Sequence, residues 1–562
     1  MPRSIARRAR ERKPNGGPHG PPFSRQGGGD GMQTKRRARG RARVWHGCAG
    51  VLAAGVLILT LLGCGGGEPD GVPVVVIGLD GATWDLLQPW IDAGELPTLA
   101  AIQRGSAWGE LQSIVPYLSP PAWASAVTGV NPGKHAIFDF QRRVPGETAI
   151  VNETAKSRRA QPIWKMLAPS GRRCLLLNIP MTDPPDPIEG LFVAGFPHPD
   201  EIGYTYPPEL ADQLGDYELD RLEMKIERGQ EDSLFAAYTR MMEERKRIVL
   251  AWLRNEPFDL LWAVFTGTDR MQHLFWKFAD PDNPHYDPAL AERYGGAIHD
   301  FWVAQDAALG EILSAVPAEA AVMLLSDHGF GPLRFSFLLH DYLERESARL
   351  SERENGSVLV LDPSDATRLY VLEKGRDPGA TLSPAEARRA RATLLDELRG
   401  AVDPGSGERI CERIWTADEV FHGTYAEKGP EIVVLPTDGY MPTMRDQQTL
   451  SGRGFVAAHG AQLSGWHRMN GIYALQGPDA SAGRRNGESG RDYSLIDIVP
   501  TLLYLLGEPI PEGLDGQLMR AVIAPERLAA APPQQAPPLE EEFRELTPEE
   551  LQNLRNLPYI GG

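Results

Sequence analysis

The sequence of 562 residues contains only four cysteines, Cys48, Cys64, Cys174 and Cys411. No two of them form a Cys-x-x-Cys pair, so the sequence indicates neither a thiolate zinc site nor a thioredoxin-type redox motif. We expect only Cys174 and Cys411 in the mature folded domain. A disulfide between these two is an alternative that their spacing does not support.

Basic charge is also scarce beyond the N-terminus. Residues 1–63 hold 13 lysines and arginines and two acidic residues, which leaves 45 basic and 73 acidic residues in 64–562, a balance of −28. A surface this acidic repels nucleic-acid backbones, so we expect no nucleic-acid partner. It suits a soluble domain, and its carboxylates can bind divalent metal ions.

The apolar run near the N-terminus is shorter than the roughly 20 residues that a membrane-spanning helix needs. It covers residues 49–62 and follows a cationic stretch at 35–43, an order typical of an export signal. The run ends in Leu-Leu-Gly-Cys64, which resembles a bacterial lipobox. We therefore predict that 1–63 is a basic N-terminus with a lipoprotein signal peptide, and that Cys64 carries a lipid. An uncleaved membrane anchor is the alternative.

A lipid on Cys64 would tether the protein to a membrane of the cell envelope, on the periplasmic or extracellular face. Met32 begins a signal of ordinary length and is a second candidate for the start of the chain. Residues 64–72 are glycine-rich and are expected to form a flexible tether.

Composition divides the remainder into one large domain, 73–525, and a C-terminal part, 526–562, in which a proline-rich linker precedes a short helix. Within the large domain, two stretches at about 140–230 and 335–455 are rich in proline, glycine and charge. We interpret both stretches as insertions that form a cap over the substrate site.

Short apolar runs alternate with helical patterns along the large domain. The expected strands are 73–78, 174–178, 259–265, 320–325, 432–435 and 471–475. The expected helices include 95–104, 233–254, 289–313, 385–398 and 495–506. This alternation predicts an α/β fold with a mainly parallel sheet and helices on both faces. Functional groups of such sheets gather at the carboxyl ends of the strands.

Acidic residues and histidines lie at the ends of four of these expected strands. They are Asp80, Asp269, His273, Asp327, His328 and His467. Singly, each has an ordinary interpretation, such as a turn, a surface ion pair or an exposed histidine. Together, three aspartates and three histidines match the ligands of two zinc-like ions, and a helix would place Asp269 and His273 on one face.

Residues 119–129 form the pattern of a complete helix. Ser119 is the expected cap, prolines occupy the first turn, and Gly129 follows the last turn. The simplest interpretation is a capped helix. A serine at this position also points its hydroxyl where the helix dipole favours an anion, as a nucleophile facing a phosphate would be placed.

The order of these motifs resembles the alkaline phosphatase superfamily, in particular its type I phosphodiesterase and nucleotide pyrophosphatase branch. The likeness covers roughly 74–140, 258–330 and 455–517. It implies a three-layer sandwich with a mainly parallel central sheet and inserted cap segments. It also implies a phosphoester substrate and two divalent metal ions, zinc or manganese.

The resemblance also implies roles for individual residues. Asp80, Asp327 and His328 would hold one metal, with Ser119 as its fourth ligand and as the nucleophile. Three further residues, Asp269, His273 and His467, would hold the second metal, and His459 is a reserve candidate for the last of these. The implied activity is phosphodiester or phosphomonoester hydrolysis on an envelope or extracellular substrate.

Two residues depart from the patterns of related enzymes and restrict the activity that the resemblance implies. Phe140 occupies the position at which nucleotide-cleaving relatives have an asparagine, which disfavours nucleotide pyrophosphatase activity. Trp123 occupies the position of the arginine in the sulfatase motif, which disfavours a modified Ser119 and sulfatase activity. A phosphotransferase or mutase, and a non-catalytic lipoprotein that serves as a binding module, remain as alternatives. The oligomeric state is not predicted.

Overall fold

The computed structural model describes residues 71–539, apart from 145, 199–202, 221–226, 346–349, 445–454 and 489, and also residue 547. The predicted signal peptide, Cys64, most of the tether and all but the first residue of the expected C-terminal helix lie outside this range. All described residues belong to one compact unit.

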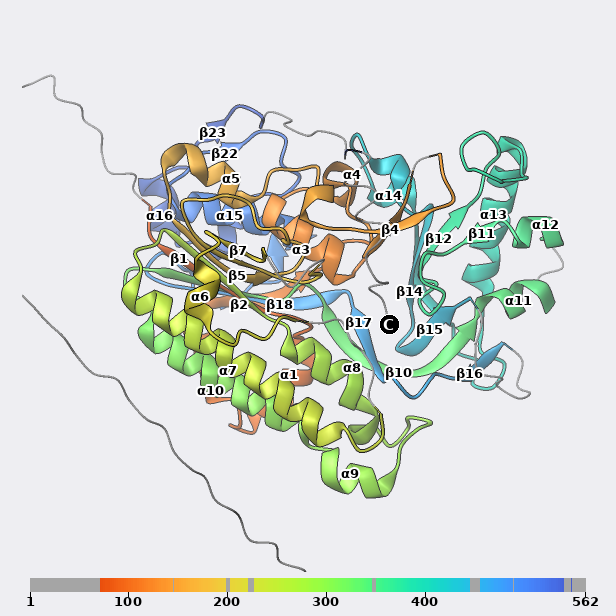
Figure 1. Ribbon diagram of the computed structural model, residues 1–562, viewed down its shortest axis with the longest axis horizontal. Helices are drawn as coiled ribbons and strands as arrows, with labels where there is room; N and C mark the ends of the chain where they lie inside the picture. The colour runs from red at the N-terminus through yellow and green to blue at the C-terminus, as the bar shows by residue number, and fades with distance from the viewer. Residues whose placement is uncertain are drawn as a thin grey trace, which may run out of the picture. The chain divides into compact units, whose positions relative to one another are not determined.

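A nine-stranded sheet organises the larger part of the described chain (Figure 1). Its order is β19 (Gly483–Arg484), β2 (Ala107–Gln112), β18 (Asn470–Gln476), β9 (Ala321–Leu325), β1 (Val74–Leu79), β8 (Leu260–Phe265), β5 (Cys174–Ile179), β6 (Gly190–Ala194) and β7 (Thr205–Tyr206). Strand β18 runs antiparallel to β9 and β2, and β7 runs antiparallel to β6. All other neighbouring pairs are parallel, so the predicted α/β fold is confirmed.

Helices cover both faces of this sheet because successive side chains of a strand point to opposite sides. On β1, Val75 and Ile77 pack into one apolar cluster, and Val74 and Val76 pack into another. The first cluster receives α1 (Trp84–Asp92), α2 (Pro97–Gly105), α7 (Glu231–Asn255), α8 (Gly267–Ala279) and α10 (Ala297–Ala315). The second receives α3 (Ser119–Thr128), α5 (Ile163–Leu167) and α15 (Ile498–Leu505). Figure 1 shows α7 and α10 on the opposite side of the sheet from α3 and α15.

A second group of strands has an apolar core of its own, and we refer to it as the cap because it includes most of the expected cap stretch 335–455. One sheet has the order β11 (Val358–Leu359), β12 (Arg368–Val371), β14 (Ile432–Pro436) and β13 (Cys411–Thr416), and α13 (Pro384–Gly400) packs against it. Another sheet has the order β15 (Gly439–Thr443), β10 (Gly329–Leu338) and β16 (Val456–Ala458), with β17 (Gly465–Arg468) also paired to β10. These elements run from green through cyan to blue in Figure 1.

Several elements differ from the sequence-based expectation. The stretch 140–230 contributes β5, β6 and β7 to the central sheet, so this part of it is not a cap insertion. The expected strand 432–435 forms β14 of the cap, and 471–475 forms the antiparallel strand β18. Residues 289–313 form two helices, α9 (Pro288–Tyr294) and α10, because Gly295 and Gly296 separate them.

The beginning of the expected C-terminal linker is also structured. Helix α16 (Pro525–Ala530) is followed by β23 (Gln535–Ala536), which pairs in parallel with β22 (Ile510–Pro511). Among the helices of the described ranges, none combines the length and the apolar character that a membrane span requires.

A buried arginine connects the cap to the larger sheet region. Arg368 on β12 donates from Nε to Asp139 Oδ2 at 2.6 Å and from Nη1 to Asp365 Oδ2 at 2.7 Å. Its side chain is 5% exposed, and the two carboxylates are equally buried. A buried cluster of this kind stabilises the fold only while all three side chains are present. A charge that lost its partner would remain buried without compensation.

The substitution Arg368→Met should therefore lower the free energy of unfolding by about 3–5 kcal/mol, since it leaves two buried carboxylates unpaired. Denaturant unfolding at pH 7 measures this change. The exposed pair Arg484–Glu110 supplies the control, and Arg484→Met should cost at most about 1 kcal/mol. Equal losses in the two variants would show that the Arg368 cluster is solvated.

Candidate metal centre

Asp80 follows β1 at its carboxyl end and is 1% exposed. The indole Nε1 of Trp123 donates to Asp80 Oδ2 at 3.1 Å, and Oδ1 makes no hydrogen bond. Gly81, with φ +70°, turns the chain immediately after the aspartate, and Gln272 Nε2 donates to its carbonyl at 2.9 Å. Gly78 lets Trp123 approach, because a Cβ there would lie 2.5 Å from the indole ring. One carboxylate oxygen is thus held, and the other is left without a partner.

Asp327 and His328 follow β9, the neighbour of β1. The backbone N–H of Gly81 donates to Asp327 Oδ1 at 3.4 Å, and Oδ2 makes no hydrogen bond. His328 Nδ1 lies 3.1 Å from the carbonyl of Gly329, which can only accept, so Nδ1 carries the proton. The lone pair of His328 Nε2 consequently faces Asp327 Oδ2 at 3.2 Å and Asp80 Oδ1 at 3.6 Å.

Ser119 is the first residue of α3 and makes no capping hydrogen bond, so the predicted serine cap is wrong. Leu118 occupies the cap position, and the Ser119 hydroxyl lies 3.2 Å from His328 Nε2 instead. Pro120 and Pro121 have no N–H groups, so they remove two of the donors that usually gather at a helix N-terminus. The Ser119 hydroxyl therefore contacts His328 and does not cap the helix.

Asp269, His273 and His467 form a second cluster. Asp269 and His273 lie one turn apart on α8, as predicted, and His467 lies on β17. Asp269 Oδ1 is 3.3 Å from His273 Nε2 and 3.4 Å from His467 Nε2, and the two Nε2 atoms are 2.9 Å apart. His273 Nδ1 donates to the carbonyl of Gly465 at 2.8 Å, so its Nε2 lone pair faces Asp269.

The two clusters adjoin each other. The rings of His328 and His467 lie 3.8 Å apart between centroids, and Asp269, His328 and His467 also form a group of ligand atoms within 4.8 Å. The reserve candidate His459 lies elsewhere, with Nδ1 2.9 Å from the Ser336 hydroxyl. Burial lowers the pKa of His459 to about 4. The structure thus brings His467, and not His459, to Asp269.

The pKa values of the centre reflect the burial of several ionisable groups close to one another. Burial, followed by repulsion from Asp327 and Asp269, raises the pKa of Asp80 well above its usual range. Burial also raises the pKa of Asp327, although His328 opposes it. Burial acts in the same direction on the pKa of Asp269, but His273 and His467 hold it well below the usual value. Burial lowers the pKa of His467 well below its usual value.

These side chains fit divalent cations. Asp80 Oδ1, Asp327 Oδ2 and Asp269 Oδ1 are each buried without a hydrogen bond, while the second oxygen of each carboxylate is held by an N–H donor. Carboxylate oxygens with imidazole nitrogens are donors that zinc and manganese accept. The carbonyl groups that receive the Nδ1 protons of His273 and His328 fix the tautomers that metal binding requires.

A mainly parallel sheet with this ligand-like cluster at its carboxyl edge suits an enzyme that hydrolyses phosphoric esters with metal ions. The chain belongs to the type I phosphodiesterase/nucleotide pyrophosphatase family, whose model matches residues 74–462. This family lies in the alkaline phosphatase superfamily and consists of metal-dependent phosphoesterases. The match includes every predicted site residue of the folded domain except His467.

Solved structures resemble the described fold at low identity. Murine ectonucleotide pyrophosphatase/phosphodiesterase 5 is 15% identical with a TM-score of 0.49, and the alignment covers 80% of this chain and all of that one. Phosphonoacetate hydrolase from Sinorhizobium meliloti 1021, solved with phosphonoformate, is 14% identical with a TM-score of 0.48, covering 77% and 95%. No curated protein sequence matches the chain.

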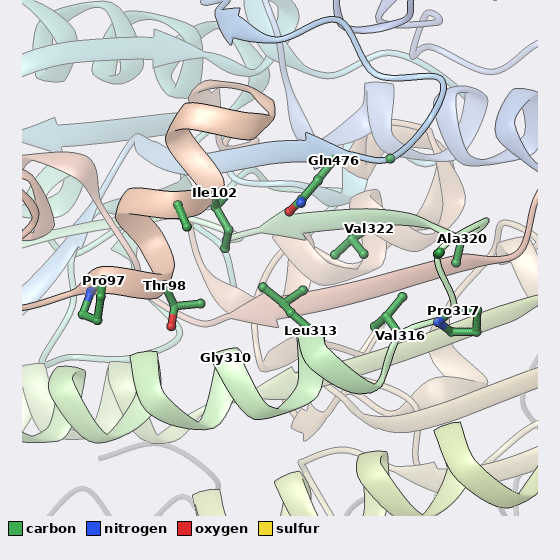
Figure 2. A pocket seen from close by; sticks show the side chains of 13 residues that line it. Pro97, Thr98, Ile102, Gly310, Leu313, Val316, Pro317, Ala320, Val322 and Gln476 are labelled. Carbon is green, nitrogen blue, oxygen red and sulfur yellow. The ribbon is translucent and has the colours of Figure 1, made fainter.

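Two cavities lie outside the ligand-like cluster. The first, of about 490 Å³, opens between α2 and α10 and is lined by Leu313, Val316 and Val322 among others (Figure 2). It lies at the amino end of β9, the opposite edge from Asp327, and none of its lining side chains can ionise. The lining of this cavity therefore offers no carboxylate, imidazole or thiol for metal binding or acid–base chemistry.

The second cavity, of about 630 Å³, lies between the segment around Phe138 and the cap. Phe138 packs in one apolar cluster with Tyr117, two residues before Ser119, so this cavity adjoins the segment that carries Ser119. Acidic partners neutralise several of its arginines, among them Arg142, which pairs with Glu153 at 3.1 Å. The lining of this cavity therefore favours neither an anionic nor a cationic ligand.

The sequence did not identify three residues that form hydrogen bonds to the aspartates of the centre. Trp123 was noted only as a departure from the sulfatase motif, and its bond to Asp80 gave no sequence signal. Thr268, whose hydroxyl donates to the Asp80 carbonyl at 2.6 Å, and Arg270, whose Nη1 lies 3.3 Å from Asp269 Oδ2, are the two sequence neighbours of Asp269. The only available signal was their position directly beside a proposed ligand.

We expect His467→Ala to weaken zinc binding by at least about tenfold, because it removes a nitrogen from the Asp269 cluster. Zinc titration of chelator-treated protein against a competing chelator measures this change. His459→Ala is the matched control, since His459 is a half-buried histidine outside both clusters, and its zinc affinity should equal that of the wild type. If His459→Ala weakened zinc binding and His467→Ala did not, His459 would be the third ligand of the Asp269 cluster.

Proposed function

We propose that this chain hydrolyses a phosphoester of the cell envelope or extracellular space, with Ser119 as nucleophile and two divalent cations, zinc or manganese. The observation that supports it is the cluster of three carboxylate oxygens without hydrogen bonds, three imidazoles and the Ser119 hydroxyl, within contact of one another. Asp80, Asp327, His328 and Ser119 would hold one cation. The other would lie among Asp269, His273 and His467.

The bound cations would supply positive charge that favours ionised Ser119 and stabilises negative charge on the phosphoryl and leaving oxygens. The Ser119 hydroxyl loses its proton to solvent and the resulting alkoxide attacks phosphorus. A new Oγ–P bond forms, and the bond from phosphorus to the substrate oxygen breaks. The departing alkoxide takes a proton from solvent. Water then attacks the phosphoserine, which releases phosphate or a phosphomonoester and restores Ser119.

The neighbourhood of Phe140 supports a substrate other than a nucleotide. Phe140 packs against Phe196 with ring centroids 6.2 Å apart, and an aromatic ring cannot donate a hydrogen bond to a phosphate oxygen as an asparagine does. A lipid head group or glycan phosphate would also suit the proposed lipid anchor. Phosphoryl transfer to an alcohol in place of water would use the same Ser119 step.

The substitution Ser119→Ala should abolish turnover of bis-p-nitrophenyl phosphate and p-nitrophenyl phosphate, with a loss of about 10³-fold or more, because no other nucleophile replaces the hydroxyl. The assay uses purified protein with zinc or manganese restored after chelation. The faster ester distinguishes a diesterase from a monoesterase.

Ser125→Ala is the control for the helix, since Ser125 lies on α3 but bonds His135 at 2.8 Å, and it should retain activity. Wild-type protein that turns over neither ester and retains no stoichiometric metal would contradict the proposed hydrolase and favour the binding module.

Cys64→Ala should release the protein from the membrane fraction of a Gram-negative host, because the proposed lipid is attached through that thiol. Labelling with a fatty acid analogue should mark the wild type and leave the variant unlabelled. A variant that stays in the membrane fraction would instead support an uncleaved N-terminal anchor.

A further inference from the structure

The three carboxylates of the centre share one pattern. In each, one oxygen accepts from a fixed N–H donor and the other makes no hydrogen bond. The donor is the Trp123 indole for Asp80 and the Gly81 backbone N–H for Asp327. For Asp269, the donor is the guanidinium of Arg270, whose Nη1 lies 3.3 Å from Oδ2. A donor on one oxygen fixes the rotation of the carboxylate and thereby the direction of the other oxygen.

Arg270 is itself held in place by two further contacts. Its Nη2 lies 3.4 Å from Asp220 Oδ1, and its guanidinium carbon lies 4.9 Å from the centre of the Phe196 ring. The Arg270 side chain is 5% exposed and that of Asp220 is 1% exposed. The guanidinium is therefore confined between a carboxylate and an aromatic face, a geometry that suits arginine better than lysine.

Asp220 offsets the charge of Arg270, which would otherwise oppose a neighbouring cation. Arg270 and Asp220 form a buried ion pair beside Asp269. The pair therefore chiefly orients Asp269. It turns Oδ1 toward His273 Nε2 at 3.3 Å and His467 Nε2 at 3.4 Å.

We propose that Arg270 is a positioning residue that holds Asp269 through Oδ2 so that Oδ1 completes a cation site with His273 and His467. This inference rests on the proposed function, because it requires that site to bind a cation. Arg270 needs no contact with the substrate. Loss of such an outer partner typically costs about 10–100-fold in metal affinity.

The test is zinc titration of chelator-treated Arg270→Met and Arg270→Lys proteins against a competing chelator. We expect the methionine variant to lose about 10–100-fold in affinity at one of two zinc sites and to keep the other unchanged. The lysine variant keeps the charge but lacks the planar fork, so we expect a loss of about tenfold at the same site. If the methionine variant does not fold, the lysine variant decides the outcome.

Arg368→Met is the matched control, because Arg368 is equally buried and also binds two aspartates, Asp139 and Asp365, but lies in the cap. It should lower stability and leave both zinc affinities unchanged. Unchanged zinc affinity in the Arg270 variants, or an equal loss in Arg368→Met, would overturn the inference. Failure of the wild type to bind zinc or manganese would instead overturn the proposed function, so the two failures are distinguishable.

Discussion

The centre depends on three carboxylates, Asp80, Asp269 and Asp327, that lie together and are each at most 3% exposed. Buried carboxylates are costly unless they are hydrogen-bonded and compensated by positive charge. Within the described part of the chain, each accepts from a single N–H donor. Arg270 is the one cationic side chain bonded to them there, and it also pairs with Asp220. The deficit of positive charge is the physical reason for assigning cations to this edge of the sheet.

Strand direction explains how ligands from distant parts of the chain meet. Asp80 and Asp327 follow parallel neighbours, so both emerge at the carboxyl edge. His467 precedes β18, and it reaches the same edge only because β18 is antiparallel to β9. In a parallel strand, the preceding residue would lie at the opposite edge. The direction of this one strand therefore decides whether the Asp269 cluster contains two histidines or one.

Sequence reasoning recovered what local patterns determine and missed what distant packing determines. The Asp269–His273 pair follows from helical spacing, and the ends of β1, β8 and β9 follow from apolar runs. The direction of β18 and the membership of β14 in the cap depend on pairing partners far along the chain, which no local pattern contains. The Asp220–Arg270 pair spans 50 residues and was invisible for the same reason.

The helix that begins at Ser119 gives a structural reason for Trp123, which replaces the arginine of the sulfatase motif. Trp123 stands where the sulfatase motif has arginine, and its indole donates to Asp80 while its ring occupies the space that Gly78 leaves. An arginine there would bring a full positive charge against Asp80 and compete with a cation for that carboxylate. A neutral donor holds Asp80 Oδ2 without that competition. Trp123 is thus compatible with a cation beside an unmodified Ser119, which is the arrangement that serine-based phosphoester hydrolysis requires.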